Sequence, residues 1–135
     1  MESLARFYKA LGDLTRLKLI RLLAEEEFCV CELAEILPCG QSGVSQHLAK
    51  LKAAGLVRER RDGHWTYYRL AAQSGLPAQV ASALDEFLRR PLGSDPDMAQ
   101  EAERLARLDR AQLCRLPGKA VTRRGTADLR PTIRP

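Results

Sequence analysis

Two cysteines separated by one residue are the side chains of this sequence best suited to binding a soft ion. Cys29 and Cys31 follow the acidic run 25–27 and open an apolar helical pattern. Thiolates are soft ligands and select soft ions over hard ones. Successive residues of a helix are turned by about 100°, so positions i and i+2 lie about 200° apart. If both thiols were on one helix, an ion would bind both only where its first turn is unwound.

Two further cysteines are candidates for a third thiolate ligand, since soft ions favour sulfur. Cys39 lies eight residues beyond Cys31. That separation is about 12 Å along a helix, which makes Cys39 the weaker candidate. Cys114 lies in the last predicted helix and can fold back on the pair, from the same or another subunit, so we favour it. A third ligand from an exogenous thiol or hydroxide stays open.

Apolar periodicity predicts four helices before a hairpin. The helices cover about 4–11, 14–24, 30–37 and 41–54, and they end near Gly12, the acidic run, Pro38 and Gly55. Asp13 or Thr15 is expected to cap the second helix. Residues 56–60 and 66–70 alternate as β-strands, with Asp62 and Gly63 in the turn between them.

The chain beyond the hairpin is predicted to be helical at 76–88 and again at 97–116, with a linker at 93–96. Pro91 ends the first of these helices. We therefore expect a mainly α fold with a two-stranded β-wing in residues 1–92. A C-terminal helix is expected in 93–116 and a basic flexible tail in 117–135.

The helices at 30–37 and 41–54, followed by a basic ribbon, have the order of a winged helix-turn-helix. Residues 41–69 carry six basic and two acidic side chains, which favours a polyanionic partner. The second helix of such a pair presents polar groups to the major groove: Gln41, Ser42, Ser45, Gln46, His47 and Lys50. The wing offers phosphate or minor-groove contacts: Arg58, Arg60, Arg61 and His64.

Four motifs in this order resemble the ArsR/SmtB family of metal-responsive bacterial repressors. They span Ala10–Arg16, Ser42–Leu48, Leu51–Val57 and Asp62–Leu70. Leu14 stands where the family has proline, which affects entry into the helix more than function. The resemblance implies a homodimer built on the first and the post-wing helices. It also implies binding to palindromic, double-stranded operator DNA and release by a metal.

The stretch Phe28–Leu33 is similar to the thiol motif of arsenic-sensing members, although their third cysteine falls on Ala34 here. Zinc-sensing members place histidine on the post-wing helix, and none occurs after His64; cadmium and lead sensors add a cysteine before Cys29, and none occurs there. We therefore predict a repressor that releases its operator when As(III) or Sb(III) binds Cys29 and Cys31. The alternative is a winged-helix repressor whose thiols sense a divalent soft metal (Cd, Pb or Zn) or redox state.

Other classes of protein are disfavoured. The cysteine spacing is not that of a thiol oxidoreductase, no βαβ pattern surrounds it, and no catalytic constellation is visible, so we expect no enzyme and no cofactor for DNA binding. Charged residues interrupt every apolar stretch before the roughly 20 residues that a membrane span needs. The start of the chain lacks the pattern of a signal peptide. We expect a cytoplasmic protein with a net charge of +5 and no membrane partner.

Overall fold

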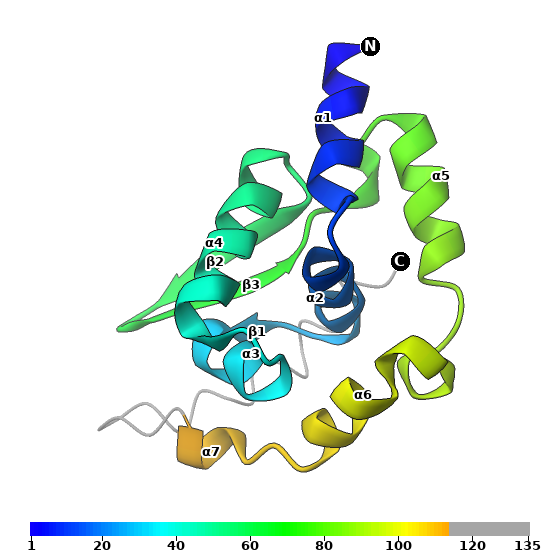
Figure 1. Cartoon of the computed structure of the whole chain (residues 1–135). Coiled ribbons are helices and arrows are strands. Elements are labelled where there is room, and N and C mark those ends of the chain that lie inside the picture. Colours follow the sequence, from blue (N-terminus) through cyan, green and yellow to red (C-terminus); the bar gives the residue numbers. More distant parts are fainter. Residues whose placement is uncertain (114–135) are drawn as a thin grey trace.

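The computed structural model describes residues 1–113, in which helices surround a small antiparallel sheet (Figure 1). Residues 114–135, which include Cys114 and the expected basic tail, lie outside the described residues. The elements are α1 (Glu2–Leu11), α2 (Leu14–Glu25), β1 (Phe28–Cys29), α3 (Val30–Ile36), α4 (Gly40–Ala53), β2 (Val57–Asp62), β3 (Trp65–Leu70), α5 (Ala78–Phe87), α6 (Ala99–Ala106) and α7 (Arg110–Leu113). The predicted mainly α fold with a β-wing is confirmed. Within residues 1–113, no helix is long and apolar enough to cross a bilayer.

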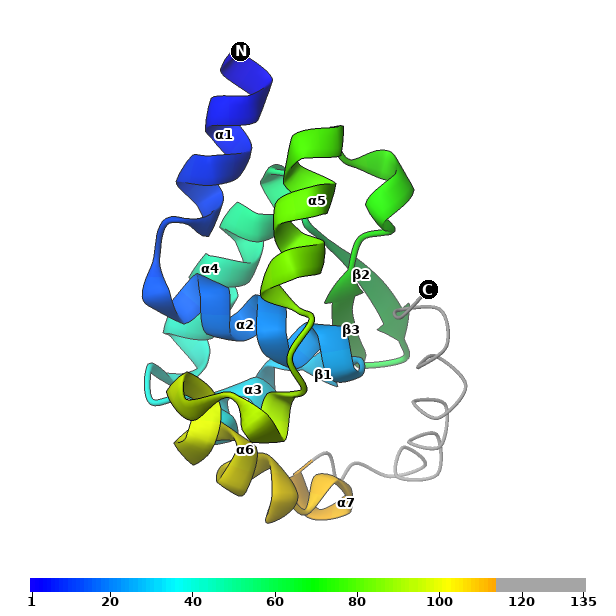
Figure 2. The same ribbon diagram turned by 90° about the vertical axis from the view of Figure 1, so that its right-hand side faces the viewer.

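Helices α3 and α4 form the helix-turn-helix pair and pack on each other, and α4 also contacts α2. Their facing apolar side chains are fully buried: Leu33, Ile36, Val44, Leu48 and Leu51. Gly40 starts α4 with a φ of 73°, a left-handed conformation that glycine adopts without steric cost. Helix α1 packs on α2, α4 and α5, and Figure 2 shows α5 passing in front of α2. The apolar core thus fixes the position of α4 while its opposite face stays open.

Asp13 caps α2, as one of the two predicted caps. Its carboxylate accepts a hydrogen bond from the Arg16 backbone N–H at 3.0 Å. This bond, helped by the charges of His47 and Arg16, holds the pKa of Asp13 below its ordinary value of 3.8. The ionised form is therefore stabilised in the folded chain.

Asp13→Ala is expected to lower the free energy of unfolding by about 1 kcal/mol at pH 7, because the N-cap acceptor is lost. Asp13→Asn keeps a hydrogen-bond acceptor at this position, so its free energy of unfolding should fall by less. Since the folded-state pKa is the lower one, this stabilisation is present above about pH 3.8 and is lost as pH falls through the folded pKa. Urea unfolding of the three proteins from pH 7 down through the acid range measures the effect; an Asp13→Ala deficit that did not shrink as the pH fell would contradict it.

The sheet has three strands in the order β1-β3-β2, where two were predicted. β1 pairs with β3 through Phe28 opposite Tyr68 and Cys29 opposite Tyr67. The hairpin is also longer than predicted, since Asp62 pairs with Trp65 and only Gly63 and His64 form the turn. Gly63 has a φ of 64°, as a tight hairpin turn requires. The short strand β1 attaches the thiol segment to the wing.

The C-terminal segment is not the single helix predicted for 97–116. It breaks at 107–109 into α6 and α7, which lie against α3. Met98 is buried in the core, and Lys18 of α2 pairs with the buried Glu101 at 2.7 Å. The Arg104 side chain donates to the Ile36 carbonyl at 3.0 Å. The segment is therefore docked on the winged helix, and its break lets α7 turn toward the thiol pair.

Candidate thiol site and nucleic-acid interface

The two thiols of Cys29 and Cys31 are already together. Cys29 is extended, with φ −93° and ψ 171°, and it is the N-cap of α3, so only Cys31 lies in the helix. Their Sγ atoms are 3.0 Å apart. Cys29 is only 1% exposed, whereas Cys31 is partly exposed. The first turn of α3 therefore does not have to unwind for the two thiols to meet, because Cys29 precedes the helix and only Cys31 lies in it.

The thiol pair lies in a small apolar cluster beside the wing. Cys29 packs with the buried Tyr67 of β3, and Cys31, Trp65 and Leu113 pack against them. Leu113 immediately precedes Cys114, which lies outside the described residues. Within residues 1–113, no group of three or more His, Cys, Asp or Glu side chains is arranged to hold a metal ion.

Cys39 is the N-cap of α4, beyond the end of α3 opposite to that of the pair. Its Cβ and Sγ lie close to where a Cβ on Gly43 would stand, at 3.2 and 3.4 Å. The length of α3, about 10 Å, separates it from Cys31. This separation agrees with the prediction from the sequence, in which Cys39 lies eight residues beyond Cys31.

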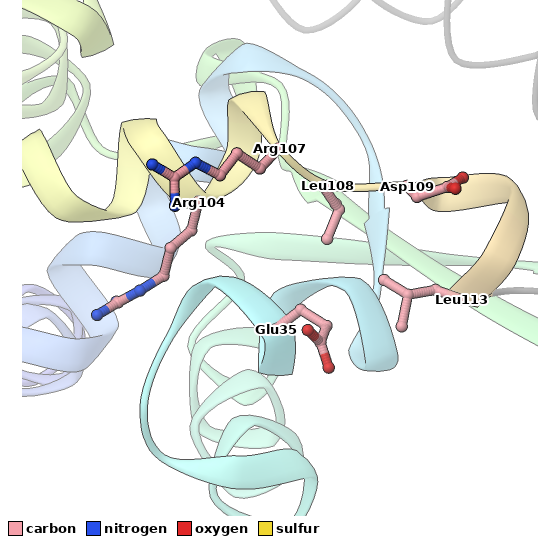
Figure 3. Close-up of a pocket in the computed structure, with 6 residues that line it drawn as sticks. All are labelled: Glu35, Arg104, Arg107, Leu108, Asp109 and Leu113. Carbon is pink, nitrogen blue, oxygen red and sulfur yellow. The ribbon is translucent and has the colours of Figure 1, made fainter.

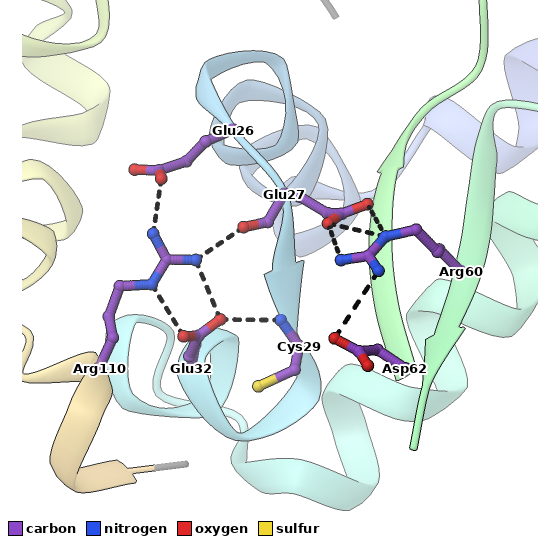
Figure 4. A network of polar contacts seen from close by, with 7 residues as sticks. All are labelled: Glu26, Glu27, Cys29, Glu32, Arg60, Asp62 and Arg110. Carbon is purple, nitrogen blue, oxygen red and sulfur yellow. Dashed lines mark hydrogen bonds and ion pairs between the residues drawn. The ribbon is translucent and has the colours of Figure 1, made fainter. Parts of the chain in front are cut away.

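Arg110 of α7 is the centre of a polar network around the thiol segment (Figure 4). Its guanidinium donates to both oxygens of Glu32, at 2.8 and 3.2 Å, and to the Glu27 carbonyl at 2.7 Å. It also binds the Glu26 carboxylate and lies over the Phe28 ring. Burial works to lower the pKa of Arg110, but the hydrogen bonds and charges of Glu32 and Glu26 outweigh it and raise that pKa.

Glu32 connects this network to the thiols. Its Oε1 accepts from the Cys29 backbone N–H at 2.9 Å, which completes a capping box at the start of α3. Glu32 is completely buried, and Arg110 neutralises it. The conformation of Cys29 therefore depends on a side chain from the C-terminal segment.

Arg60 of the wing is held by Glu27 rather than being free. Its guanidinium donates to the buried Glu27 carboxylate at 2.6 to 3.2 Å and lies over the Tyr67 ring. The hydrogen bond that Arg60 donates to Glu27 is the main reason that the pKa of Arg60 is raised. The structure thus shows that Arg60 joins β2 to the segment that carries the thiols, and the DNA contact expected of it stays a prediction.

A cavity of about 430 Å³ lies between α3 and the C-terminal segment (Figure 3). Its lining is of mixed charge: Glu35, Arg104, Arg107, Leu108, Asp109 and Leu113. Because of this cavity, the C-terminal segment is not fully packed against α3. The attachment of α7 therefore depends strongly on the bonds made by Arg110.

Five of the six α4 side chains expected to read DNA are exposed on its outer face: Gln41, Ser42, Ser45, Gln46 and Lys50. His47 is different, because it is half-buried and its Nδ1 lies 3.2 Å from the Arg16 guanidinium. It therefore faces the α1–α2 junction rather than the open side. On the wing, Arg58, Arg61 and His64 are exposed.

The comparisons with known proteins agree with this geometry. The family model described as "Bacterial regulatory protein, arsR family" matches residues 13–59. The arsenical resistance operon repressor of Escherichia coli K12 is 41% identical over 85 residues, 62% of this chain and 71% of the repressor. An arsenic resistance transcriptional regulator of Pseudomonas putida is 37% identical over 103 residues, 75% of this chain and 76% of the regulator. The chain belongs to the arsR family of bacterial regulatory proteins.

A solved structure extends the family likeness to the fold. The homodimeric winged helix-turn-helix DNA-binding domain of a Mycobacterium bovis protein superposes with a TM-score of 0.55 at 33% identity, covering 63% of this chain and 77% of that one. The ArsR-family assignment makes this chain a DNA-binding transcriptional repressor of the ArsR/SmtB group. The family is one of regulators rather than enzymes.

Several residues of this ArsR-family chain that matter structurally were missed from the sequence. Glu27, Glu32 and Arg110 position the thiol segment, and Arg110 lies outside the matched residues 13–59. One available signal was the spacing of Cys29 and Glu32, which is that of a capping box with cysteine in place of serine. No local signal identifies the partner of Arg110, because 78 residues separate it from Glu32.

Proposed function

We propose that this ArsR-family repressor senses trivalent arsenic or antimony through Cys29 and Cys31 and releases its operator when the ion binds. The 3.0 Å separation of the two Sγ atoms at the start of the helix-turn-helix carries the proposal. The protein acts in the cytoplasm as a homodimer, like the homodimeric relative, and each subunit provides a thiol pair.

The distance between the thiols is short enough for one ion to bind both sulfurs. Two sulfurs that bind one ion with bonds of about 2.3 Å lie about 3.8 Å apart at tetrahedral angles and about 3.2 Å apart at angles near 90°. The Sγ atoms of this pair are 3.0 Å apart. Both ligands are soft sulfur, which suits trivalent arsenic and antimony.

Cys114 supplies the third sulfur in this proposal. Leu113, the residue before it, packs against the cluster of Cys29 and Tyr67. Cys39 is a poorer third ligand because α3 separates it from the pair. A small exogenous thiol or hydroxide completes the centre if Cys114 does not.

Ion binding reaches the DNA surface through two short connections. Cys29 caps α3, so a change at Cys29 moves the first helix of the DNA-reading pair. Glu27, two residues earlier, holds Arg60 of the wing. A shift of residues 27–31 therefore disturbs both elements that flank α4. By linkage, bound DNA weakens ion binding by the same factor.

In the DNA complex, α4 enters the major groove and the wing contacts the adjacent backbone or minor groove. We propose that base edges and phosphates are contacted by these exposed side chains: Gln41, Ser42, Ser45, Gln46, Lys50, Arg58, Arg61 and His64. His47 and Arg60 act from behind this surface, His47 through Arg16 and Arg60 through Glu27.

Operator release tests the proposal, with a duplex from the region upstream of the chain's own gene as probe. Arsenite should weaken binding by wild type by about 5- to 150-fold, the usual range of allosteric coupling. Cys29→Ser and Cys31→Ser should bind DNA normally and show no release. Cys39→Ser is the matched control and should behave as wild type, while Cys114→Ser should need more arsenite.

The alternative inducers are separate arms of the same titration. Release of wild type by cadmium but not arsenite would replace the metalloid with a divalent soft metal. Release by peroxide alone, reversed by a reductant, would make the close thiols a redox switch. Arsenite release from Cys29→Ser equal to that from wild type would refute the assigned site.

A further inference from the structure

Four basic side chains line a hollow at the end of α4 that lies beside α1. The hollow has a volume of about 400 Å³. Three alanines complete its walls, and no carboxylate is among the lining residues: Arg6, Lys9, Ala10, Arg16, Lys50, Ala53 and Ala54. We call it the basic hollow. It collects cations from α1, α2 and α4.

The charges of the basic hollow are mostly uncompensated. Elsewhere, these basic side chains are each paired with a carboxylate: Lys18, Arg21, Arg89, Arg107 and Arg110. Across residues 1–113, the side chains of Arg6, Lys9 and Lys50 make no ion pair or hydrogen bond. Asp13, whose pKa Arg16 helps to lower, lies outside the lining.

Arg16 is fixed in position by groups that carry no negative charge. Its Nε donates to the Ala10 carbonyl, and one of its terminal nitrogens lies 3.2 Å from Nδ1 of His47. These contacts orient the guanidinium without cancelling its charge. The partial negative charge at the end of α4, about half an elementary charge, is small beside four cations. The basic hollow is thus built for an anion.

The basic hollow continues the outer face of α4. Lys50 lines it and lies one helical turn beyond Gln46, which is on the open face. With 14 residues, α4 is about 21 Å long. The major groove is about 12 Å wide, so a helix of this length in the groove reaches the phosphates at its rim.

We propose that the basic hollow receives a backbone phosphate of bound DNA at the rim of the groove that α4 occupies. Arg6, Lys9 and Arg16 are then DNA contacts in addition to those on α4 and the wing. The proposal rests on DNA binding through the open face of α4. The small alanine side chains leave room for the phosphodiester to approach the four cations.

The double variant Arg6→Ala/Lys9→Ala tests this in the full chain, because both residues are exposed on a helix where alanine is well tolerated. Binding is measured from low to high salt on the upstream duplex and on an unrelated duplex. Each lost phosphate contact lowers the slope of log K against log salt by about 0.9. We expect about a tenfold loss of affinity near physiological salt, equal on both duplexes, because phosphates carry no sequence information.

Arg89→Ala/Arg107→Ala is the matched control, since it removes the same charge from exposed positions on other faces. An unchanged slope in the test variant, or an equal fall in the control, would overturn the proposal. So would a loss of dimer by the test variant in sedimentation, which would make the basic hollow a subunit contact. Failure of wild type to bind either duplex would instead refute DNA binding itself.

Discussion

Arg110→Ala should lower the free energy of unfolding by about 3–5 kcal/mol, the cost of leaving a buried charge without its partner. Glu32 is 0% exposed and its side chain is neutralised by Arg110. The variant also loses the contacts to Glu26, the Glu27 carbonyl and the Phe28 ring. Urea unfolding at neutral pH measures the loss, and faster reaction of Cys29 with a thiol reagent should report exposure of the site.

Arg107→Ala is the control for this prediction. Arg107 also pairs with a glutamate, Glu103, at 2.8 Å, but its side chain is 76% exposed. Exposed pairs contribute about 0–1 kcal/mol, so the control should unfold almost as wild type does. Arg110→Lys keeps the charge but loses the planar guanidinium. Its free energy of unfolding should therefore lie between those of Arg110→Ala and Arg107→Ala. A stability of Arg110→Ala equal to that of Arg107→Ala would show that Glu32 finds another partner.

Local sequence patterns were sufficient for the DNA-reading part of the fold. Apolar spacing in α3 and α4 reflects burial of Leu33, Ile36, Val44 and Leu48, so periodicity located both helices within one or two residues. Asp13 was identifiable as a cap from its side chain and its place before an apolar run. The exposed face of α4 could be predicted because the apolar residues of this helix identify the face that packs in the core.

Contacts between residues far apart in the sequence could not be predicted from those patterns. Strand β1 has two residues, too few to show alternation, and it exists because β3 lies beside it. The predicted start of the third helix at residue 30 agrees with α3, but the local pattern did not predict the Glu32 capping box that accompanies the extended conformation of Cys29. The sequence does not show which arginine of the wing forms an ion pair and which stays exposed. Only the fold shows that Glu27, 33 residues away from Arg60, selects that arginine.

The pairing of Arg60 with Glu27 predicts an asymmetry between variants of the two residues. Glu27 is completely buried, whereas the Arg60 side chain is 39% exposed. Arg60→Ala leaves a buried carboxylate unpaired and should lower the free energy of unfolding by about 3 kcal/mol. Glu27→Gln leaves an arginine that can turn to water, and it should cost only about 1 kcal/mol.

DNA binding separates this role of Arg60 from that of its neighbours. Arg58 and Arg61 are exposed on the same strand, so their alanine variants should unfold nearly as wild type does while lowering the salt dependence of DNA binding by about 0.9 per contact. Arg60→Ala should show the reverse, with lower stability and an unchanged salt slope. Because Glu27→Gln frees Arg60 and loosens the link from the thiol segment to β2, arsenite should release this variant less completely than wild type. If Arg60→Ala lost salt dependence as Arg58→Ala does and kept its stability, Arg60 would be a DNA contact and the wing would have no link to Glu27.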